Sequence, residues 1–114
     1  MGARVNPAPS LPVPQRHPVT TLDALPAGAG KAFMVAGKKI AIFNAGGRLF
    51  AIGDECPHVG ASLAEGTLDG NVVACPWHFA EFDVTCGKVL SSPATEDVPS
   101  YPVFVNGNSV EVEL

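Results

Sequence analysis

The chain has 114 residues, which suits one domain with a single modest core. Hydrophobic residues make up 46% of the chain and charged residues only 16%, which excludes a disordered protein, and three cysteines argue against a disulfide framework. A formal net charge of −4 disfavours nucleic acid and anionic membranes as partners, and no apolar run approaches the roughly 18 residues of a membrane span. We therefore expect a cytoplasmic protein with reduced thiols.

The N-terminal segment, residues 1–17, contains four prolines and few side chains that could be buried. Such a composition favours an extended, mobile chain with polyproline II character. We predict a disordered Pro-rich tail at residues 1–17 and one folded domain at residues 18–114.

The rest of the chain is organised as short strands between turn residues. Residues 19–25 can form one helical turn, which Pro26 ends. Turns at Ala45-Gly46-Gly47 and at Asn106-Gly107-Asn108 separate runs that are typical of strands. Strands are predicted at residues 33–36, 38–44, 48–52, 72–74, 82–84, 101–105 and 109–114. This spacing indicates an all-β fold, an antiparallel sandwich or barrel.

Two short motifs carry the chemistry of the chain. Cys56-Pro57-His58 is followed, after 16 residues, by Cys75-Pro76-Trp77-His78. Each motif holds a cysteine and a histidine too close in sequence for both to face a core, and a proline that stiffens the loop. Two soft thiolates with two imidazoles suit zinc or iron–sulfur chemistry.

The residues around these motifs resemble the Rieske ferredoxin pattern. The resemblance rests on residues 56–63, Gly66, residues 75–78 and Phe82-Asp83, and extends from about residue 19 to residue 114. It implies the Rieske fold, with a cluster-binding subdomain of two loops at about residues 54–86. It also implies one [2Fe–2S] cluster, with Cys56 and Cys75 on one iron and His58 and His78 on the other.

The loops lack the two further cysteines that high-potential Rieske proteins carry, so the resemblance is to the low-potential, oxygenase-associated branch. This predicts a midpoint potential of about −150 mV, the lower end of the range for such centres. Acidic residues flank the motifs and favour a low potential as well: Asp54, Glu55, Glu65, Glu81 and Asp83.

Several loop residues deserve separate predictions. Phe79 stands where the family usually has glycine, so a positive φ at this position would strain the backbone. Cys86 replaces a common threonine and is predicted to be a small buried or turn residue, not a ligand. Leu63 and Trp77 are expected either to cover the cluster or to pack as ordinary loop residues. Ser92-Pro93-Ala94 resembles the proline loop of the family.

The resemblance implies an electron carrier without catalytic residues of its own. Its expected partners are a flavin-dependent NAD(P)H reductase and a terminal oxygenase, of the ring-hydroxylating class. The small Rieske subunit of an NADH-dependent nitrite reductase has similar length and loops and remains an alternative. A structural zinc module is a remote alternative, since generic Cys/His spacings also bind zinc.

Overall fold

The computed structural model describes residues 15–57, 60–77, 79–92 and 94–114. These residues form antiparallel strands and two short 3-10 turns, which confirms the predicted all-β class. The strands are β1 (Arg16–Thr21), β2 (Gly30–Val35), β3 (Lys38–Ala45), β4 (Arg48–Gly53), β5 (Thr67–Asp69), β6 (Val72–Ala74), β7 (Glu81–Asp83), β8 (Ser100–Tyr101), β9 (Val103–Asn106) and β10 (Ser109–Glu113). The 3-10 turns are η1 (Leu22–Ala24) and η2 (Leu63–Glu65). Within these ranges no helix is long and apolar enough to cross a membrane.

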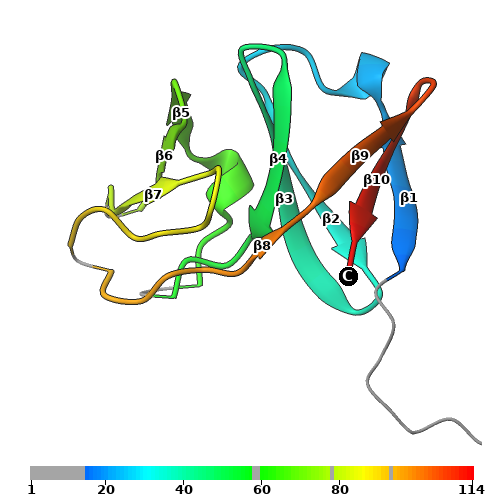
Figure 1. Ribbon diagram of the computed structural model, residues 1–114. Helices are drawn as coiled ribbons and strands as arrows, with labels where there is room; N and C mark the ends of the chain where they lie inside the picture. Colours follow the sequence, from blue (N-terminus) through cyan, green and yellow to red (C-terminus); the bar gives the residue numbers. More distant parts are fainter. Residues whose placement is uncertain (1–14, 58–59, 78, 93) are drawn as a thin grey trace, which may run out of the picture.

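The strands are arranged in three sheets, in the orders β1-β10-β9, β2-β3-β4-β8 and β5-β6-β7. Figure 1 shows the first two sheets on one side of the molecule and β5, β6, β7 and η2 on the other. We call the first part the base and the second part, with the loops that lead into and out of it, the small lobe. The chain enters the small lobe after β4 and returns to the base at β8.

Strand β1 was not predicted: the sequence indicated one helical turn at residues 19–25, which the structure forms only as η1, and residues 19–21 belong to β1. Arg16 and His17, which we expected in the tail, pair with Glu113 and Val112 of β10. The Arg16 guanidinium lies 3.6 Å from the centre of the Phe104 ring, so its flat face covers an aromatic side chain of β9. The folded domain therefore includes these two residues, because their backbone pairs with β10. The amino-acid composition of residues 1–17 does not show this pairing. Residues 1–14 lie outside the described part of the chain.

The predicted strands are present, with ends that differ by up to three residues, except around Pro102. The expected single strand at residues 101–105 is divided into β8, which pairs with β4, and β9, which pairs with β10. Proline has no N–H to donate to a ladder, so the strand changes sheets there. Strand β5 was not predicted, since Leu68 is its single apolar residue; it pairs with β6 across Gly70-Asn71.

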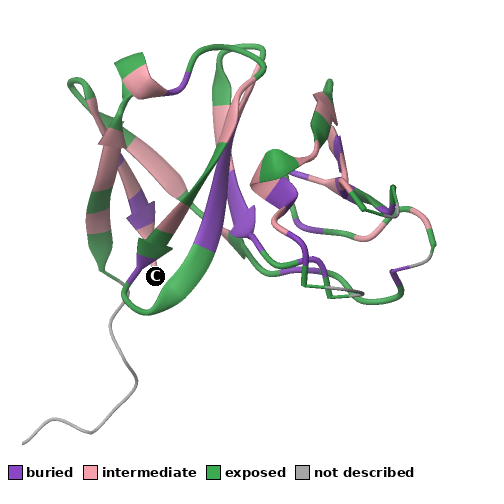
Figure 2. Ribbon diagram, turned by 180° about the vertical axis from the view of Figure 1, so that it is seen from behind, coloured by how far each residue is buried: buried purple, intermediate pink, exposed green. Residues whose placement is uncertain are grey.

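Two cores lie on opposite faces of strand β3. Successive side chains of a strand point to opposite faces, so Ile40 and Ile42 pack in the base, against Val110 and Val112 of β10. Ala41 and Phe43 face the other way, into a second core shared with the small lobe. Figure 2 shows buried residues along this strand and its neighbour. The small lobe thus packs against one face of the base, through the side chains of β3.

Candidate metal centre

Cys56 lies in the loop that follows β4, residues 54–62, which we call loop one. The Cys56 N–H donates to the Ala61 carbonyl (2.9 Å), and the Gly60 N–H donates back to the Cys56 carbonyl (2.7 Å). Gly60 has φ 75°, the left-handed conformation that glycine adopts without steric cost. These two hydrogen bonds close the loop between Cys56 and Ala61, and Cys56 is 1% exposed.

Cys75 follows β6 and opens loop two, residues 75–80. The Cys75 N–H donates to the Ala80 carbonyl (2.8 Å), and the Phe79 N–H donates to the Cys75 carbonyl (2.9 Å). The two hydrogen bonds of loop two have the same residue spacing as those of loop one. The two loops are therefore closed in the same way, although the Cys-x-His and Cys-x-x-His motifs differ in length. Phe79 occupies the place of Gly60 and has φ 62°, the conformation that we expected to strain the backbone at this residue.

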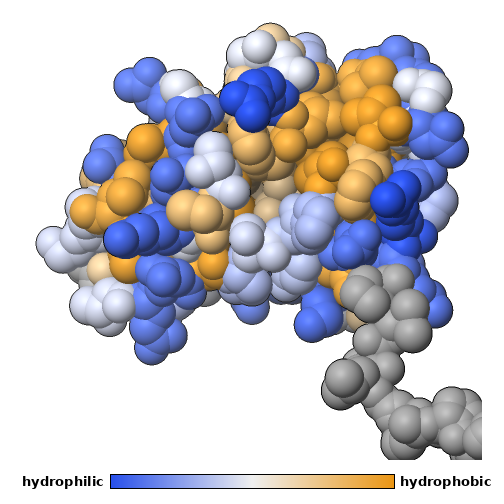
Figure 3. All heavy atoms as spheres, in the orientation of Figure 1, coloured by the Kyte–Doolittle hydropathy of each residue, from blue (hydrophilic) through white to orange (hydrophobic). Residues whose placement is uncertain are grey.

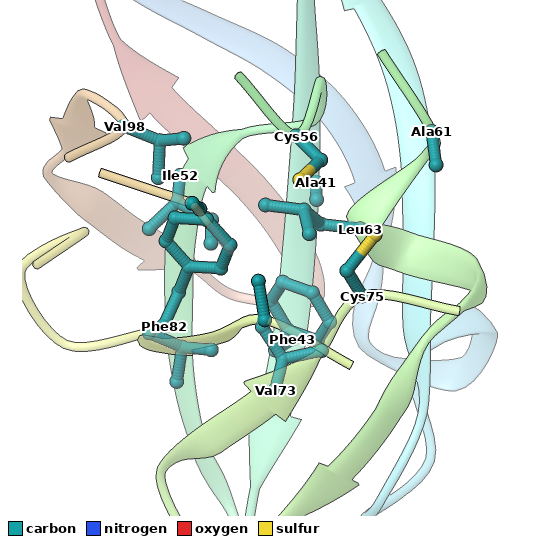
Figure 4. Close-up of a cluster of buried hydrophobic side chains, with 13 residues drawn as sticks. Ala41, Phe43, Ile52, Cys56, Ala61, Leu63, Val73, Cys75, Phe82 and Val98 are labelled. Carbon is teal, nitrogen blue, oxygen red and sulfur yellow. The ribbon is translucent and has the colours of Figure 1, made fainter. Parts of the chain in front are cut away.

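The two cysteines enter the same core from separate loops, as Figure 4 shows. Both are buried, and neither they nor Cys86 form a disulfide. Two thiols brought together from two similarly closed loops fit the thiolate half of a [2Fe–2S] site. His58 and His78, the predicted imidazole ligands, lie outside the described residues. Within the described ranges, therefore, no group of three candidate ligands is assembled.

Asp54 anchors the start of loop one and is almost entirely buried, with 4% of its surface exposed. Its Oδ1 accepts hydrogen bonds from the Ser62 hydroxyl and from the Ala64 N–H, each at 2.9 Å. Its carbonyl also accepts a bond from the Leu63 N–H (2.7 Å). The sequence identified Asp54 only as a negative charge near the motif, whereas its carboxylate ties both ends of loop one together.

Substitution of Asp54 tests this anchor. We expect Asp54→Ala to lower the free energy of unfolding by about 2 kcal/mol, because two hydrogen bonds to a charged acceptor are lost and their donors stay partly buried. Asp54→Asn keeps one oxygen acceptor and should cost less than half as much. Thermal unfolding of the three proteins measures both effects. Equal melting temperatures for wild type and Asp54→Ala would contradict the anchoring role.

Loop two is followed by a tight turn at residues 83–87. The Thr85 hydroxyl and N–H both donate to Asp83 Oδ1, at 2.6 and 2.9 Å, and hold the pKa of that carboxyl below its usual value. The Gly87 N–H donates to the Asp83 carbonyl (2.7 Å). Cys86 lies exposed in this turn, which confirms its prediction as a turn residue.

The remaining loop predictions have mixed outcomes. Leu63 is fully buried in the core that holds both cysteines, so it packs beneath the loops. Trp77 is 63% exposed and Phe79 is 71% exposed, so neither ring is packed into the small lobe. Ala94 of the expected proline loop joins the same core as the cysteines, and Pro93 lies outside the described residues.

A groove of about 530 Å³ is lined by β4, β8 and β9 of the base and by Val84 and Thr85 of the small lobe. Leu49, Phe50, Val103 and Phe104 contribute its apolar walls, and Figure 3 shows apolar side chains gathered over these strands. Burial raises the pKa of Tyr101, which also lines it. Neither candidate cysteine borders this groove, so it is separate from the metal centre.

Comparison with known proteins identifies the family. Residues 15–102 match the Rieske [2Fe-2S] domain, a range that includes both motifs and all strands up to β8. The chain therefore belongs to the Rieske [2Fe–2S] family. Family membership implies an iron–sulfur cluster and favours it over the zinc alternative.

Relatives of this Rieske protein are ferredoxin components of dioxygenase systems. The 3-phenylpropionate/cinnamic acid dioxygenase ferredoxin subunit of Shigella boydii is 46% identical over 76 residues, which cover 66% of this chain and 72% of that protein. The ferredoxin component of the naphthalene 1,2-dioxygenase/salicylate 5-hydroxylase systems of a Ralstonia species is 36% identical over 93 residues, covering 82% and 89%.

Solved Rieske structures agree with the fold. The ferredoxin of carbazole 1,9a-dioxygenase from Nocardioides aromaticivorans superimposes with a TM-score of 0.82 at 32% identity, over 85% of this chain and 95% of that one. A structure described as a complex of reduced oxygenase and oxidized ferredoxin in carbazole 1,9a-dioxygenase gives 0.80 at 34% identity, over 85% and 91%. A nitrite reductase small subunit shares the fold, with 0.74 at 22% identity, over 86% and 97%.

Proposed function

We propose that this Rieske protein carries single electrons from a flavin-dependent NAD(P)H reductase to a terminal oxygenase of the ring-hydroxylating class. The observation that supports this most is its likeness, at 34% identity, to a ferredoxin chain solved together with its oxygenase. The relatives that match most of the chain are themselves named as dioxygenase ferredoxins. We also propose the cytoplasm as its location, because three cysteines without a disulfide suit a reducing compartment.

We propose Cys56, His58, Cys75 and His78 as the four ligands of the cluster. When bound, a [2Fe–2S] cluster accepts and releases one electron. The protein contributes two loops of matching closure, each closed by hydrogen bonds of a buried cysteine's N–H and carbonyl. Neutral imidazoles in place of two thiolates reduce the negative charge around the irons and make reduction easier than in an all-cysteine site.

An electron-transfer assay tests the function. Anaerobically purified protein is reduced with dithionite and mixed, in a stopped-flow instrument, with the oxidised terminal oxygenases of the phenylpropionate, naphthalene and carbazole systems. The large subunit of a nitrite reductase serves as a further acceptor. We expect rapid oxidation of the protein by at least one oxygenase. Oxidation by the nitrite reductase subunit alone would overturn the proposal in favour of the alternative function.

Replacement of a histidine ligand should change the midpoint potential. We expect His58→Cys to retain a cluster but to lower its potential from about −150 mV toward the roughly −400 mV of all-cysteine clusters, because a thiolate adds negative charge at the iron. A redox titration followed by visible absorption measures the shift. His17→Cys, in β1 of the base, is the matched control and should leave the potential unchanged. Equal potentials for wild type and His58→Cys would remove His58 from the ligand set.

A further inference from the structure

Phe79 combines a strained backbone conformation with an exposed aromatic side chain. Its φ of 62° lies in the left-handed region, which a side chain with a Cβ adopts only at a steric cost. Its ring is 71% exposed, so burial in the small lobe does not compensate for that cost. Gly60 holds the equivalent place in loop one without this penalty. The closure of loop two, in which the Phe79 N–H donates to the Cys75 carbonyl, accounts for this backbone conformation. It does not account for a large exposed ring at a position that glycine fills in loop one, and such a side chain points to a role outside the folded chain.

The position of Phe79 in the sequence places this role next to the proposed metal centre. It directly follows His78, a proposed ligand, and neighbouring Cα atoms are about 3.8 Å apart. Trp77 precedes the same histidine and is 63% exposed. Among the large hydrophobic side chains that are exposed in the described ranges, these two are the aromatic ones. Two exposed aromatic residues thus bracket one proposed cluster ligand.

Exposed aromatic rings have a well-defined use at protein interfaces. They supply large apolar contact area with few rotatable bonds, and a few such residues dominate binding energy. Electron transfer slows steeply with distance, so a partner that receives an electron must dock close to the ligands. A ring fixed beside a ligand can set that approach, and the rigid closure of loop two by the Cys75 carbonyl holds it in place.

We infer that the Phe79 side chain is a docking contact for the terminal oxygenase, inserted into an apolar recess of that partner beside the cluster. The inference rests on the proposed function and identifies which residue makes the contact. The hydrogen bonds that close loop two, and that set the positive φ of Phe79, then also hold its ring at the surface. Binding buries the ring and provides the stabilisation that the free protein lacks.

The variant Phe79→Gly separates docking from folding. Glycine tolerates φ 62°, so the variant should keep its cluster, its visible spectrum and its midpoint potential, and should be at least as thermally stable as wild type. Its apparent KM as electron donor to the oxygenase that accepts electrons fastest from wild type should rise about tenfold, the effect expected for a small hot-spot residue. Phe79→Tyr keeps an aromatic ring and should retain the wild-type KM.

The chain offers a matched control for strain relief. Ala36, in the turn between β2 and β3, is another non-glycine residue with positive φ (49°), so Ala36→Gly relieves similar strain away from the loops. It should leave the KM unchanged. A wild-type KM for Phe79→Gly would overturn the docking role while leaving the proposed function intact. Failure of wild-type protein to reduce any oxygenase would instead overturn the proposed function.

Discussion

Replacing Cys56 or Cys75 by alanine is expected to give colourless protein that lacks iron and labile sulfide. Both thiols are buried in the core shared by the base and the small lobe, and the N–H and carbonyl of each cysteine make the hydrogen bonds that close its loop. Removal of either leaves three ligands at most, and cluster sites of this type require four. The measurement is the iron and acid-labile sulfide content per chain after anaerobic purification, together with the visible absorption spectrum.

Cys86 provides the matched control for this experiment. It is the third cysteine of the chain, and it lies exposed in the turn after β7. Cys86→Ala should therefore keep the full iron and sulfide content and the wild-type spectrum. If Cys86→Ala lost the cluster while Cys75→Ala retained it, the ligand assignment would be wrong.

Gly87→Ala is expected to destabilise the protein more than any other glycine substitution outside the metal centre. Gly87 has φ 81°, and a Cβ at this position would overlap the carbonyl oxygen of Val98, whose N–H donates to the Gly87 carbonyl (2.9 Å). The backbone must shift, since neither partner is a flexible side chain end. We expect a loss of more than about 4 kcal/mol, the size associated with strain and a steric clash acting together.

Two other glycines separate the two causes. Gly70 has φ 61° but open space around its Cβ position, so Gly70→Ala should cost only about 1 kcal/mol. Gly66 has an ordinary φ of −79° but would place a Cβ against the Ala74 carbonyl oxygen, so Gly66→Ala reports the clash alone. Melting temperatures of the four holoproteins, measured at one scan rate, give the comparison. A Gly87→Ala protein no less stable than Gly70→Ala would show that the contact with Val98 is unimportant.

The sequence predicted the parts of this protein that depend on local patterns. The cysteine and histidine motifs identified the candidate ligands, and apolar runs between turn residues located most strands. The sequence also identified Phe79 as a residue that a positive φ would strain, because the family usually has glycine at this position. The family and the all-β class followed from these features.

The features that were missed depend on contacts between distant parts of the chain. Arg16 and His17 belong to the domain because β10 accepts them as partners. The role of Asp54 depends on η2 folding back over it, which no spacing shows. The identical closure of the two loops was hidden by motifs of unequal length. The division of the strand at Pro102, in contrast, could have been predicted from the sequence, because proline cannot donate a hydrogen bond to a neighbouring strand.

Strand β3 has a consequence for how this protein can change over time. Because Ile40 and Ile42 face the base while Ala41 and Phe43 face the small lobe, a one-residue insertion or deletion would exchange the two sets. Both cores would then receive side chains of the wrong size at once. Both cores therefore constrain the length of this strand. Insertions and deletions must be confined to turns such as the one at Gly46-Gly47.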